Sequence, residues 1–349
     1  MMNARALALA GLAAILLAAG AGMADITIET VPVGNPGNAG ELSGSGAGGY
    51  GPDRICGAVD YDYNIGKYEV TAGQYTAFLN AVAGVDAYAL YNTTMSRTDY
   101  GSGIARSGGG TVGDPYTYSV DAAFVNRPVN YVSWGDAVRF ANWLTNGQGN
   151  GSTETGAYDL NGAMTDADLL DVVVPTAAQR ATWSTGATSF FLLTSEDEWY
   201  KAAYYNPSTS SYYDYPTSSN SVPGRDMADA SGNNANYYGN PYPIDSPYYT
   251  TLAEEFQNSD SPYGTFDQGG NVWEWNESIL YGGSYRGLRG GSFNFDDNSL
   301  RAADRLYNYP TYEILDIGFR VSEVPEPASM AVLALGSIGM LLRRRGAGR

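Results

Sequence analysis

The sequence predicts a single α+β domain with little regular secondary structure. Its apolar residues recur in short segments, some at helical and some at strand spacing, and glycine-rich polar stretches separate them. The 349 residues include 44 glycines and 29 tyrosines, a mixture that favours ordered loops over long helices. Because 44% of the residues are apolar and neither an internal repeat nor a second domain boundary is visible, we expect one sizeable core.

The first predicted elements follow a stretch rich in Gly, Ser, Asn and Pro, residues 35–52, which predicts a loose linker. The β-branched and aromatic residues of segment 65–71 predict a strand. Thr71 is a suitable N-cap for a helix that runs to Val82 and places its apolar residues on one face. Residues 90–118 are rich in Gly, Ser and Thr and predict a surface loop.

The middle of the chain alternates extended and helical segments. Residues 126–134 predict an extended segment that Ser133 ends, and the spacing of apolar residues over 135–144 predicts a second helix. After a polar loop over 146–162, a further helix is expected over 166–173, with helical character continuing toward Trp183.

A short buried strand is predicted for residues 190–193, followed by a helix that Ser195 caps and that runs through Tyr204. Residues 205–265 contain no convincing helix and are dense in Tyr, Asn, Ser, Pro and Asp. A stretch of this length is uncommon in a compact domain, so we expect a ligand, a metal or aromatic packing to order it.

Charge and residue types exclude several classes of function. The formal net charge of −18 leaves no basic surface to neutralise phosphates, which argues against nucleic-acid binding. The chain has no histidine, and its one cysteine is Cys56. Ser-His-Asp and Cys-His catalysis, His-ligated zinc and the two-His-one-carboxylate iron site are therefore excluded. Any metal must be held by oxygen ligands, which favours calcium.

Both ends of the chain carry targeting signals. Residues 1–24 have a positive start, an apolar run and small residues before Asp25, which predicts a signal peptide. Residues 324–349 contain Pro-Glu-Pro, an apolar run shorter than the ~20 residues of a membrane span, and three consecutive arginines. This tail resembles the PEP-CTERM sorting signal of Gram-negative bacteria. The resemblance implies processing by an exosortase, transient membrane anchoring, and a place in the cell envelope, cell surface or extracellular matrix.

Seven segments between these ends resemble, in order, the formylglycine-generating enzyme family, also called the sulfatase-modifying-factor domain. They are residues 65–71, residues 127–143 with Arg-Pro-Val and Ser-Trp, the Ser-Glu-Asp-Glu-Trp of 195–199, the Gly-Asn-Val-Trp-Glu-Trp of 270–275, the Arg-Gly-Gly-Ser of 289–292, Arg301 with Arg305, and the Gly-Phe-Arg of 318–320. The resemblance covers residues 58–322, after a Gly-, Ser- and Pro-rich linker over 25–57. It implies a fold related to C-type lectins, with bound calcium.

Active members of that family oxidise a substrate cysteine in sulfatases, using two active-site cysteines and copper. By resemblance these cysteines lie between the Gly-Gly-Ser motif and the arginines that follow, an interval that here runs from Phe293 to Leu300 and holds no cysteine. Phe295 occupies the offset of the first catalytic cysteine. We therefore assign no catalytic residue and expect no copper, since thiolate ligation needs sulfur at the site.

The stretch Gly269 to Trp275, with two tryptophans around Glu274, suggests unusual backbone conformations around a buried charge that needs a partner. The family resemblance implies a calcium site there, and oxygen ligands on a glycine-rich turn agree with it. Its ligands would be Asp267, the carbonyls of Gly270 and Val272, and Glu274. A second family site would map to Asn236, the carbonyl of Tyr237, Asp245 and the carbonyl of Pro247.

Each of these signals also has a structural interpretation. Glu274 would pair with an arginine such as Arg289 or Arg301, and the tryptophans of 273–275 would build the core rather than stack on sugars. Arg301, Arg305 and Arg320 would pair internally rather than bind an anion. Glu196 and Glu198 fit the first turn of a helix. Cys56 has no basic cluster in its sequence neighbourhood apart from Arg54 and is a poor nucleophile.

We therefore expect an exported protein of the cell surface or matrix whose domain has lost the family's catalytic cysteines. It would be a calcium-stabilised binding or matrix component for a polysaccharide or protein ligand. The alternative is an oxidoreductase of the formylglycine-generating type that acts on protein substrates such as sulfatases.

Overall fold

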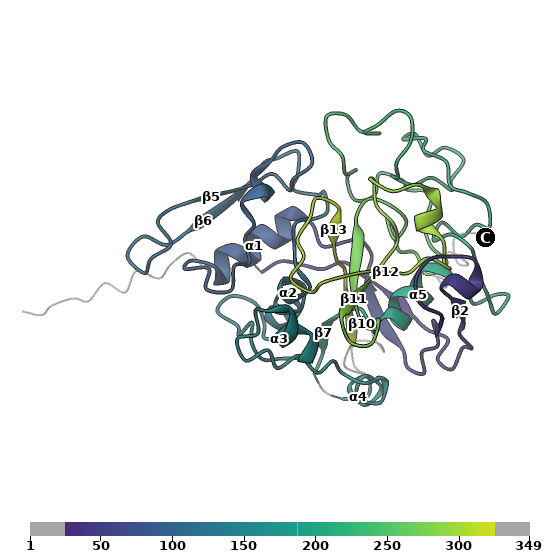
Figure 1. Ribbon diagram of the computed structural model, residues 1–349, viewed down its shortest axis with the longest axis horizontal. Coiled ribbons are helices and arrows are strands. Elements are labelled where there is room, and N and C mark those ends of the chain that lie inside the picture. The colour runs from purple at the N-terminus through teal and green to yellow at the C-terminus, as the bar shows by residue number, and fades with distance from the viewer. Residues whose placement is uncertain (1–24, 187, 325–349) are drawn as a thin grey trace, which may run out of the picture.

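The computed structural model describes residues 25–186 and 188–324 as one domain of mixed helices and strands (Figure 1). The predicted signal peptide and almost all of the C-terminal tail lie outside these residues. Two four-stranded sheets and five short helices form the domain, and loops make up most of the remainder.

The first sheet joins the two ends of the described chain. Its strands are antiparallel, in the order β1 (Thr30–Val33), β4 (Tyr63–Gly66), β14 (Val321–Val324) and β7 (Phe190–Leu193). The strand predicted for residues 190–193 is thus confirmed. The strand predicted for 65–71 ends at Gly66, because the backbone beyond it bonds to separate segments: Lys67 to Glu29, and Val70 to Phe319 and Val129.

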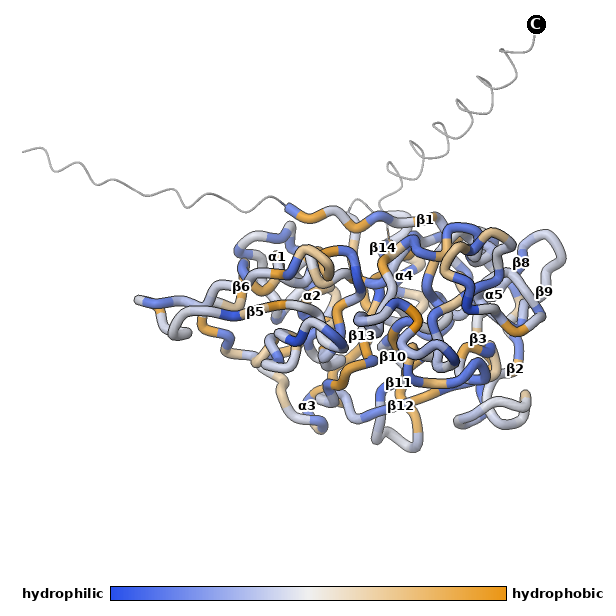
Figure 2. Tube along the Cα trace, turned by 90° about the horizontal axis from the view of Figure 1, so that it is seen from above, coloured by the Kyte–Doolittle hydropathy of each residue, from blue (hydrophilic) through white to orange (hydrophobic). Residues whose placement is uncertain are grey.

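The second sheet carries the central tryptophan stretch. Its order is β12 (Leu306–Asn308), β11 (Tyr285–Arg289), β10 (Trp273–Leu280) and β13 (Ile317–Gly318). Strands β10 and β11 are antiparallel, whereas β10 and β13 are parallel. Figure 2 shows β10, β11 and β12 following one another toward one side of the molecule, opposite β1 and β14.

All five α-helices of the described residues begin with a capping box. They are α1 (Ala72–Val82), α2 (Trp134–Thr145), α3 (Asp166–Asp171), α4 (Ala177–Trp183) and α5 (Glu196–Tyr204). A Ser or Thr N-cap accepts a hydrogen bond from the third residue, whose side chain bonds back to the cap backbone in a capping box. The predicted N-caps Thr71 and Ser195 are confirmed. Ser133, which we expected only to end an extended segment, is the N-cap of α2, and the helix begins one residue before the expected Gly135.

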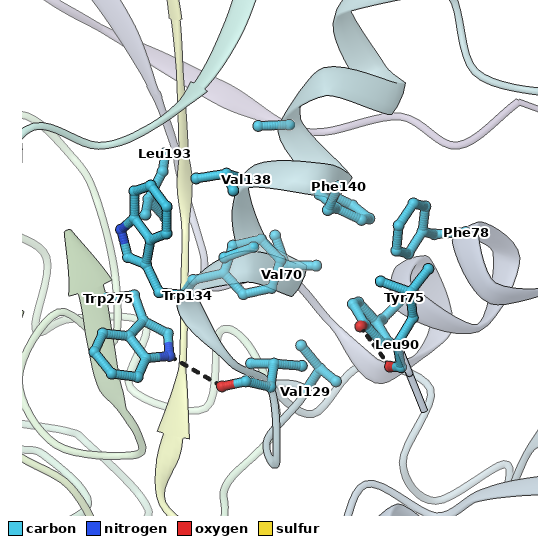
Figure 3. Packing of buried hydrophobic residues seen from close by; sticks show 14 of the residues in the cluster. Val70, Tyr75, Phe78, Leu90, Val129, Trp134, Val138, Phe140, Leu193 and Trp275 are labelled. Atoms are coloured by element: carbon cyan, nitrogen blue, oxygen red, sulfur yellow. Dashed lines mark hydrogen bonds between the residues drawn. The ribbon is translucent and has the colours of Figure 1, made fainter. Parts of the chain in front are cut away.

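The main core lies between α1, α2 and both sheets, and it is largely aromatic. Phe78 of α1 and Phe140 of α2 pack edge to face with ring centroids 5.3 Å apart, as Figure 3 shows. Trp275 of β10 is fully buried in the same core, near Trp134 in Figure 3, and its indole donates a hydrogen bond of 2.9 Å to the carbonyl of Val132. The prediction that the tryptophans build the core is confirmed, since Trp273 is also buried.

Two segments predicted as loose are ordered. The expected linker 35–52 contains β2 (Glu41–Ser43) and the 3-10 helix η1 (Ser45–Ala47), and β2 pairs with β3 (Arg54–Cys56). It is held because Ser43 and Gly44 bond to the carbonyls of Ala302 and Ala303. The expected loop 90–118 contains η2 (Thr93–Ser96) and the hairpin of β5 (Ile104–Ser107) and β6 (Thr117–Val120).

The long segment 205–265 is free of helices, as predicted, and carries only the short pair β8 (Tyr205–Asn206) and β9 (Ser211–Tyr212). Buried polar side chains order it, in addition to the aromatic packing that we expected. The carboxylate of Asp229 accepts hydrogen bonds from Asn234, from the backbone of Asn258 and from Ser259. None of the helices in the part of the chain that the structure describes has the length and apolar content of a membrane span.

Candidate functional site

The central stretch begins as a turn and ends as strand β10. Asp267, Gly270 and Asn271 all have positive φ, and at Gly270 a Cβ would lie 2.1 Å from the carbonyl oxygen of Asn236. Only glycine fits there. Beyond the turn, Glu274 is paired in register with Arg289 of β11 and Gly318 of β13. The turn therefore brings the acidic side chains before and within β10 into the interior of the domain.

Glu274 forms a fully buried ion pair with Arg320. The guanidinium donates from Nε to Oε2 at 2.6 Å and from Nη2 to Oε1 at 2.7 Å, and the indole of Trp199 donates to Oε2 at 2.7 Å. The sequence interpretation that Glu274 pairs with an arginine is thus confirmed, but the partner is neither Arg289 nor Arg301. Arg289 instead forms an ion pair with Glu196, as described below. The partner of Glu274, Arg320, comes from the Gly-Phe-Arg segment.

Two further carboxylates lie close to this pair. Glu69 and Asp267 are both buried among charges that include Glu274 and Arg320. Burial, together with the neighbouring carboxylates, holds the pKa of Glu69 well above its usual range. Burial likewise raises the pKa of Asp267 to about 7, against the opposing effects of Arg320 and a hydrogen bond from the backbone of Glu254. The carboxylates of Glu69, Asp267 and Glu274 therefore all interact with the charge of one guanidinium, that of Arg320.

This cluster contains acceptor atoms without donors. Oε1 of Glu69 and Oδ2 of Asp267 are buried and have no hydrogen-bond partner. Such atoms are costly unless a proton or a cation satisfies them. If all three carboxylates ionise, two negative charges remain after Arg320, which matches a divalent cation with oxygen ligands. No group of three or more His, Cys, Asp or Glu side chains within the described residues is arranged to hold a metal by itself. A cation here would thus also need backbone carbonyls, as expected of Gly270 and Val272.

The residues of the second predicted calcium site lie in the same long loop but have other partners. The side-chain amide of Asn236 donates to the carbonyl of Tyr249 at 2.9 Å and to Oδ1 of Asn271 at 3.2 Å. The carboxylate of Asp245 accepts from Arg127 at 2.6 Å. The remaining two members are Tyr237, whose hydroxyl donates to the carbonyl of Pro223, and Pro247, which follows a cis peptide bond. No hydrogen bond joins Asn236 to Asp245 in the described part of the chain.

The interval after Gly-Gly-Ser places Phe295 at the surface. Its ring is 41% exposed and packs edge to face on Trp273, with ring centroids 5.4 Å apart. The carbonyl of Phe295 accepts a hydrogen bond of 2.8 Å from the backbone of Tyr238. Asn294 accepts one of 3.0 Å from the hydroxyl of Tyr242. The interval is therefore bound to the loop that crosses it.

We call six neighbouring aromatic residues the Phe295 face. It consists of the ring pair Trp273 and Phe295 and of a separate row of touching rings, Phe293, Tyr249, Tyr242 and Tyr238. The carbonyl of Phe295, which accepts from the backbone of Tyr238, joins the pair to the row. The ring centroids of Tyr238 and Tyr242 are 4.8 Å apart, and those of Tyr242 and Tyr249 are 5.4 Å apart. Tyr238 is 54% exposed. The indole nitrogen of Trp273 is buried without a hydrogen-bond partner. The face thus offers exposed rings and an unsatisfied donor beneath them.

A second charged cluster surrounds Glu196 at the start of α5. Its carboxylate accepts hydrogen bonds from Arg289 and Arg305, and Arg54 lies 3.1 Å from it. Although burial raises the pKa of Glu196, the charges of these three arginines lower it to about 2. Internal pairing is thereby confirmed for Arg305, as it is for Arg320. The role of Glu196 is to hold three arginines in place.

Cys56 lies within this cluster, which corrects one sequence inference. We expected no basic cluster near Cys56, yet Arg289 lies 3.3 Å from its sulfur and Arg54 lies 3.6 Å from it. The sequence could not show this, because Arg289 reaches Cys56 from β11. Burial and the charge of Glu196 nevertheless raise the pKa of the thiol to about 11, so it is a poor nucleophile.

We expect Cys56 to resist thiol reagents in the folded protein. At pH 8 its thiolate fraction should be on the order of 100-fold below that of a free cysteine, whose pKa is about 8.5. Labelling with iodoacetamide, followed by mass spectrometry, measures the rate. Protein unfolded in guanidinium chloride is the control and should react at the rate of a free thiol. Equal rates for folded and unfolded protein would contradict the assignment.

The sequence analysis did not place three residues in the central cluster: Glu69, Asn271 and Arg320. For Arg320 it predicted an internal ion pair without naming Glu274 as the partner. Asn271 donates to Glu69 and accepts from the backbone of Thr251, so it ties the turn to the acidic cluster. A signal was present for Glu69, which is the one acidic residue of segment 65–71 and lies between Tyr68 and Val70. The pairing of Arg320 with Glu274 had no local signal in the sequence, because the two residues lie 46 positions apart.

Comparisons with known proteins agree with this architecture. A family model described as sulfatase-modifying factor enzyme 1-like domain matches residues 56–324, and one for the PEP-CTERM protein-sorting motif matches residues 323–345. No curated protein matches the chain.

Two solved structures have a similar fold. Treponema denticola variable protein 1 matches with a TM-score of 0.51 and 19% identity, over 85% of this chain and 95% of its own. The crystal structure of CarF matches with a TM-score of 0.50 and 20% identity, over 85% of this chain and 98% of its own. Together with the family match, these structures confirm the predicted fold.

Proposed function

Since the chain belongs to the family of sulfatase-modifying factor enzyme 1-like domains and carries a PEP-CTERM sorting motif, we propose that it is an exported binding component of the cell surface or matrix. In this proposal the family's scaffold serves to present a ligand-binding surface. The sorting motif implies handling by exosortase-type machinery and export to the envelope or surface of a Gram-negative bacterium.

The observation that carries the proposal is the Phe295 face. At the offset where the resemblance expects a catalytic thiol stands a half-exposed phenyl ring, which packs on Trp273. Hydrogen bonds of Phe295 and Asn294 hold the segment against Tyr238 and Tyr242, whose rings pack on each other. Aromatic rings supply large contact areas with few rotatable bonds, which makes them effective in binding surfaces. The segment that in active relatives performs oxidation is here suited to hold a partner, either a polysaccharide or a protein of the matrix.

We propose further that calcium stabilises the scaffold beneath this face. Asp267, Glu274 and the carbonyls of Gly270 and Val272 would hold the ion, and Glu69 would contribute the charge that the unpartnered oxygens indicate. The ion would fix the turn before β10 and thereby Trp273, on which Phe295 rests. A second ion at Asn236, Tyr237, Asp245 and Pro247 would require Asp245 to release Arg127.

Binding is tested with the full chain on a glycan array and in pull-downs with matrix polymer. The double variant Phe295→Ala, Tyr238→Ala should lose at least 10-fold in affinity, which corresponds to about 1.4 kcal/mol. Tyr312→Ala, which removes a similarly exposed ring elsewhere, is the matched control and should bind normally. Blank results with the wild-type chain, or unchanged binding by the double variant, would overturn the proposal.

The rival activity is oxidation of a protein cysteine. Copper-loaded chain incubated with a cysteine peptide from a sulfatase should leave the peptide mass unchanged in mass spectrometry. Conversion of the peptide's cysteine to formylglycine would establish an enzyme and contradict the non-catalytic assignment. An active member of the family, assayed beside it, shows that the conditions support turnover.

A further inference from the structure

A second aromatic surface lies on β11 and β12 and on the segments next to them, and it shares no residue with the Phe295 face. It consists of five tyrosines, Tyr50, Tyr281, Tyr285, Tyr307 and Tyr309, which we call the tyrosine surface. Three of them are about half exposed: Tyr50 at 51%, and Tyr281 and Tyr309 at 48% each. Large aromatic side chains that gather at a surface mark interaction sites more often than isolated ones do.

The rings touch one another in a continuous row. Tyr307 is central, with ring centroids 4.4 Å from Tyr281 and 4.8 Å from Tyr285. The ring of Tyr50 is nearly parallel to that of Tyr307, at 6° and 6.2 Å, and their hydroxyls are 3.3 Å apart. Tyr309 extends the row beyond Tyr285 at 4.8 Å. Because the rings support one another, little side-chain entropy remains to be lost when a partner binds.

The backbone around these five tyrosines holds their rings in place and leaves them uncovered. Gly287 of β11 stands opposite Tyr307 in the register, so no β11 side chain covers the ring at that position. Tyr50 comes from the stretch that the sequence predicted to be a loose linker, and its carbonyl accepts a hydrogen bond of 3.0 Å from the backbone of Arg305. Arg305 in turn donates to the carbonyl of Pro52. The surface is therefore built by elements from both ends of the chain.

The chemistry of the surface indicates an uncharged partner. None of the ring or hydroxyl contacts of these five tyrosines in the described residues involves a charged side chain. The whole chain carries a net charge of −18, which repels polyanions. A partner must offer apolar faces for the rings and hydrogen-bonding edges for the phenol hydroxyls. The pyranose rings of a neutral polysaccharide have both, since their C–H groups form flat faces and their hydroxyls lie at the rim.

The position of the surface fits a protein attached through its C-terminal tail. Figure 2 shows β12 on the side of the molecule opposite β14, and β14 is the strand that leads into the sorting motif. We propose that the tyrosine surface binds a neutral polysaccharide by stacking its sugar rings. This goes beyond the function proposed above, because a second surface would let one molecule bridge two ligands.

The test uses the full chain and two probes, cellohexaose as the neutral glucan and a hexameric polyuronate as its anionic counterpart. Isothermal titration should show binding of cellohexaose and at least 10-fold weaker binding of the polyuronate. The double variant Tyr281→Ala, Tyr309→Ala should weaken cellohexaose binding at least 10-fold. Tyr312→Ala, at an exposed ring outside both surfaces, is the matched control and should leave it unchanged. The double variant Phe295→Ala, Tyr238→Ala is titrated in parallel. Cellohexaose binding that is lost in this variant and kept in Tyr281→Ala, Tyr309→Ala would overturn the tyrosine-surface proposal, so failure of this proposal and failure of the Phe295 face are distinguished.

A second measurement on the wild-type chain does not depend on the folding of a variant. Acetylation of tyrosine hydroxyls by N-acetylimidazole, read by mass spectrometry, should be slowed by cellohexaose at Tyr50, Tyr281 and Tyr309 and not at Tyr312, an exposed tyrosine outside both surfaces. No binding of cellohexaose, equal protection of Tyr312, or unchanged binding by the double variant would overturn the proposal. Loss of self-association in the double variant without any glucan binding would assign the surface to a second copy of the chain and overturn it equally.

Discussion

Replacement of Glu196 by Gln should lower the free energy of unfolding by about 3–5 kcal/mol, the cost typical of breaking a buried ion pair. Glu196 is 3% exposed and balances Arg289 and Arg305, which are both buried, as well as Arg54. The amide keeps the shape of the side chain but leaves these guanidinium groups without their charge partner. Urea denaturation at pH 7 measures the change in free energy.

The matched control is Glu29→Gln, which removes the charge of an exposed carboxylate paired with Lys67. Its effect should stay within about 0.5 kcal/mol, as is typical of surface ion pairs. Because the pKa of Glu196 is lowered to about 2, its contribution to stability is present above the unfolded pKa near 4 and is lost as the pH falls toward 2. Glu196→Gln should therefore show a weaker loss of stability between pH 5 and pH 2 than the wild type. Equal stability of the two proteins at pH 7 would contradict the role of Glu196.

Calcium should stabilise the chain strongly at pH 8 and weakly at pH 5. The raised pKa of Asp267 means that, without calcium, the contribution of this one residue to stability is greatest below the ordinary aspartate pKa near 4 and falls as the pH rises through about 7. Ionised Asp267 and Glu69 then provide the charge that a divalent cation binds. At a concentration 100 times its Kd, calcium should add about 2.7 kcal/mol at pH 8. Thermal melts with calcium or EDTA at both pH values measure this difference.

Asp267→Asn is the variant that separates a calcium site from a purely structural cluster. Without calcium at pH 8 it should be more stable than the wild type, by up to about 4 kcal/mol, because the buried charge is gone. It should also lose its response to calcium. Glu274→Ala is less informative, since it leaves Arg320 buried without a partner in either case. Asp99→Asn, at an exposed pair with Arg97, should respond to calcium as the wild type does. If Asp267→Asn responded to calcium as strongly as the wild type does, the proposed calcium site would be contradicted.

The helices were predictable because their signals are local. Each helix has a Ser or Thr N-cap followed three residues later by an acidic or amide side chain. The two residues of this signal lie within one helical turn of each other. The segments that were mispredicted depend on distant partners. Residues 35–52 look like a linker until Ser43 and Gly44 meet Ala302 and Ala303, more than 250 residues away. Composition alone cannot show such contacts.

The candidate site was predictable in its motifs and not in its pairings. The motifs that hold Glu274 and Phe295 lie within the residues that the family model matches, but which arginine faces Glu274 depends on how β10 and β13 are aligned. The same holds for Cys56, whose basic neighbours come from β3 and β11. Long-range charge pairing in this fold follows from strand register, and a single sequence carries no direct signal for it.

The strand that ends the described chain has a mechanical consequence for a tethered protein. β14 is bonded to β7 through four residue pairs on one side and to β4 on the other. A force applied along the axis of this strand would load both ladders in shear, so that their hydrogen bonds would have to break together instead of one at a time. The strand that leads into the sorting motif is thus held in the sheet from two sides.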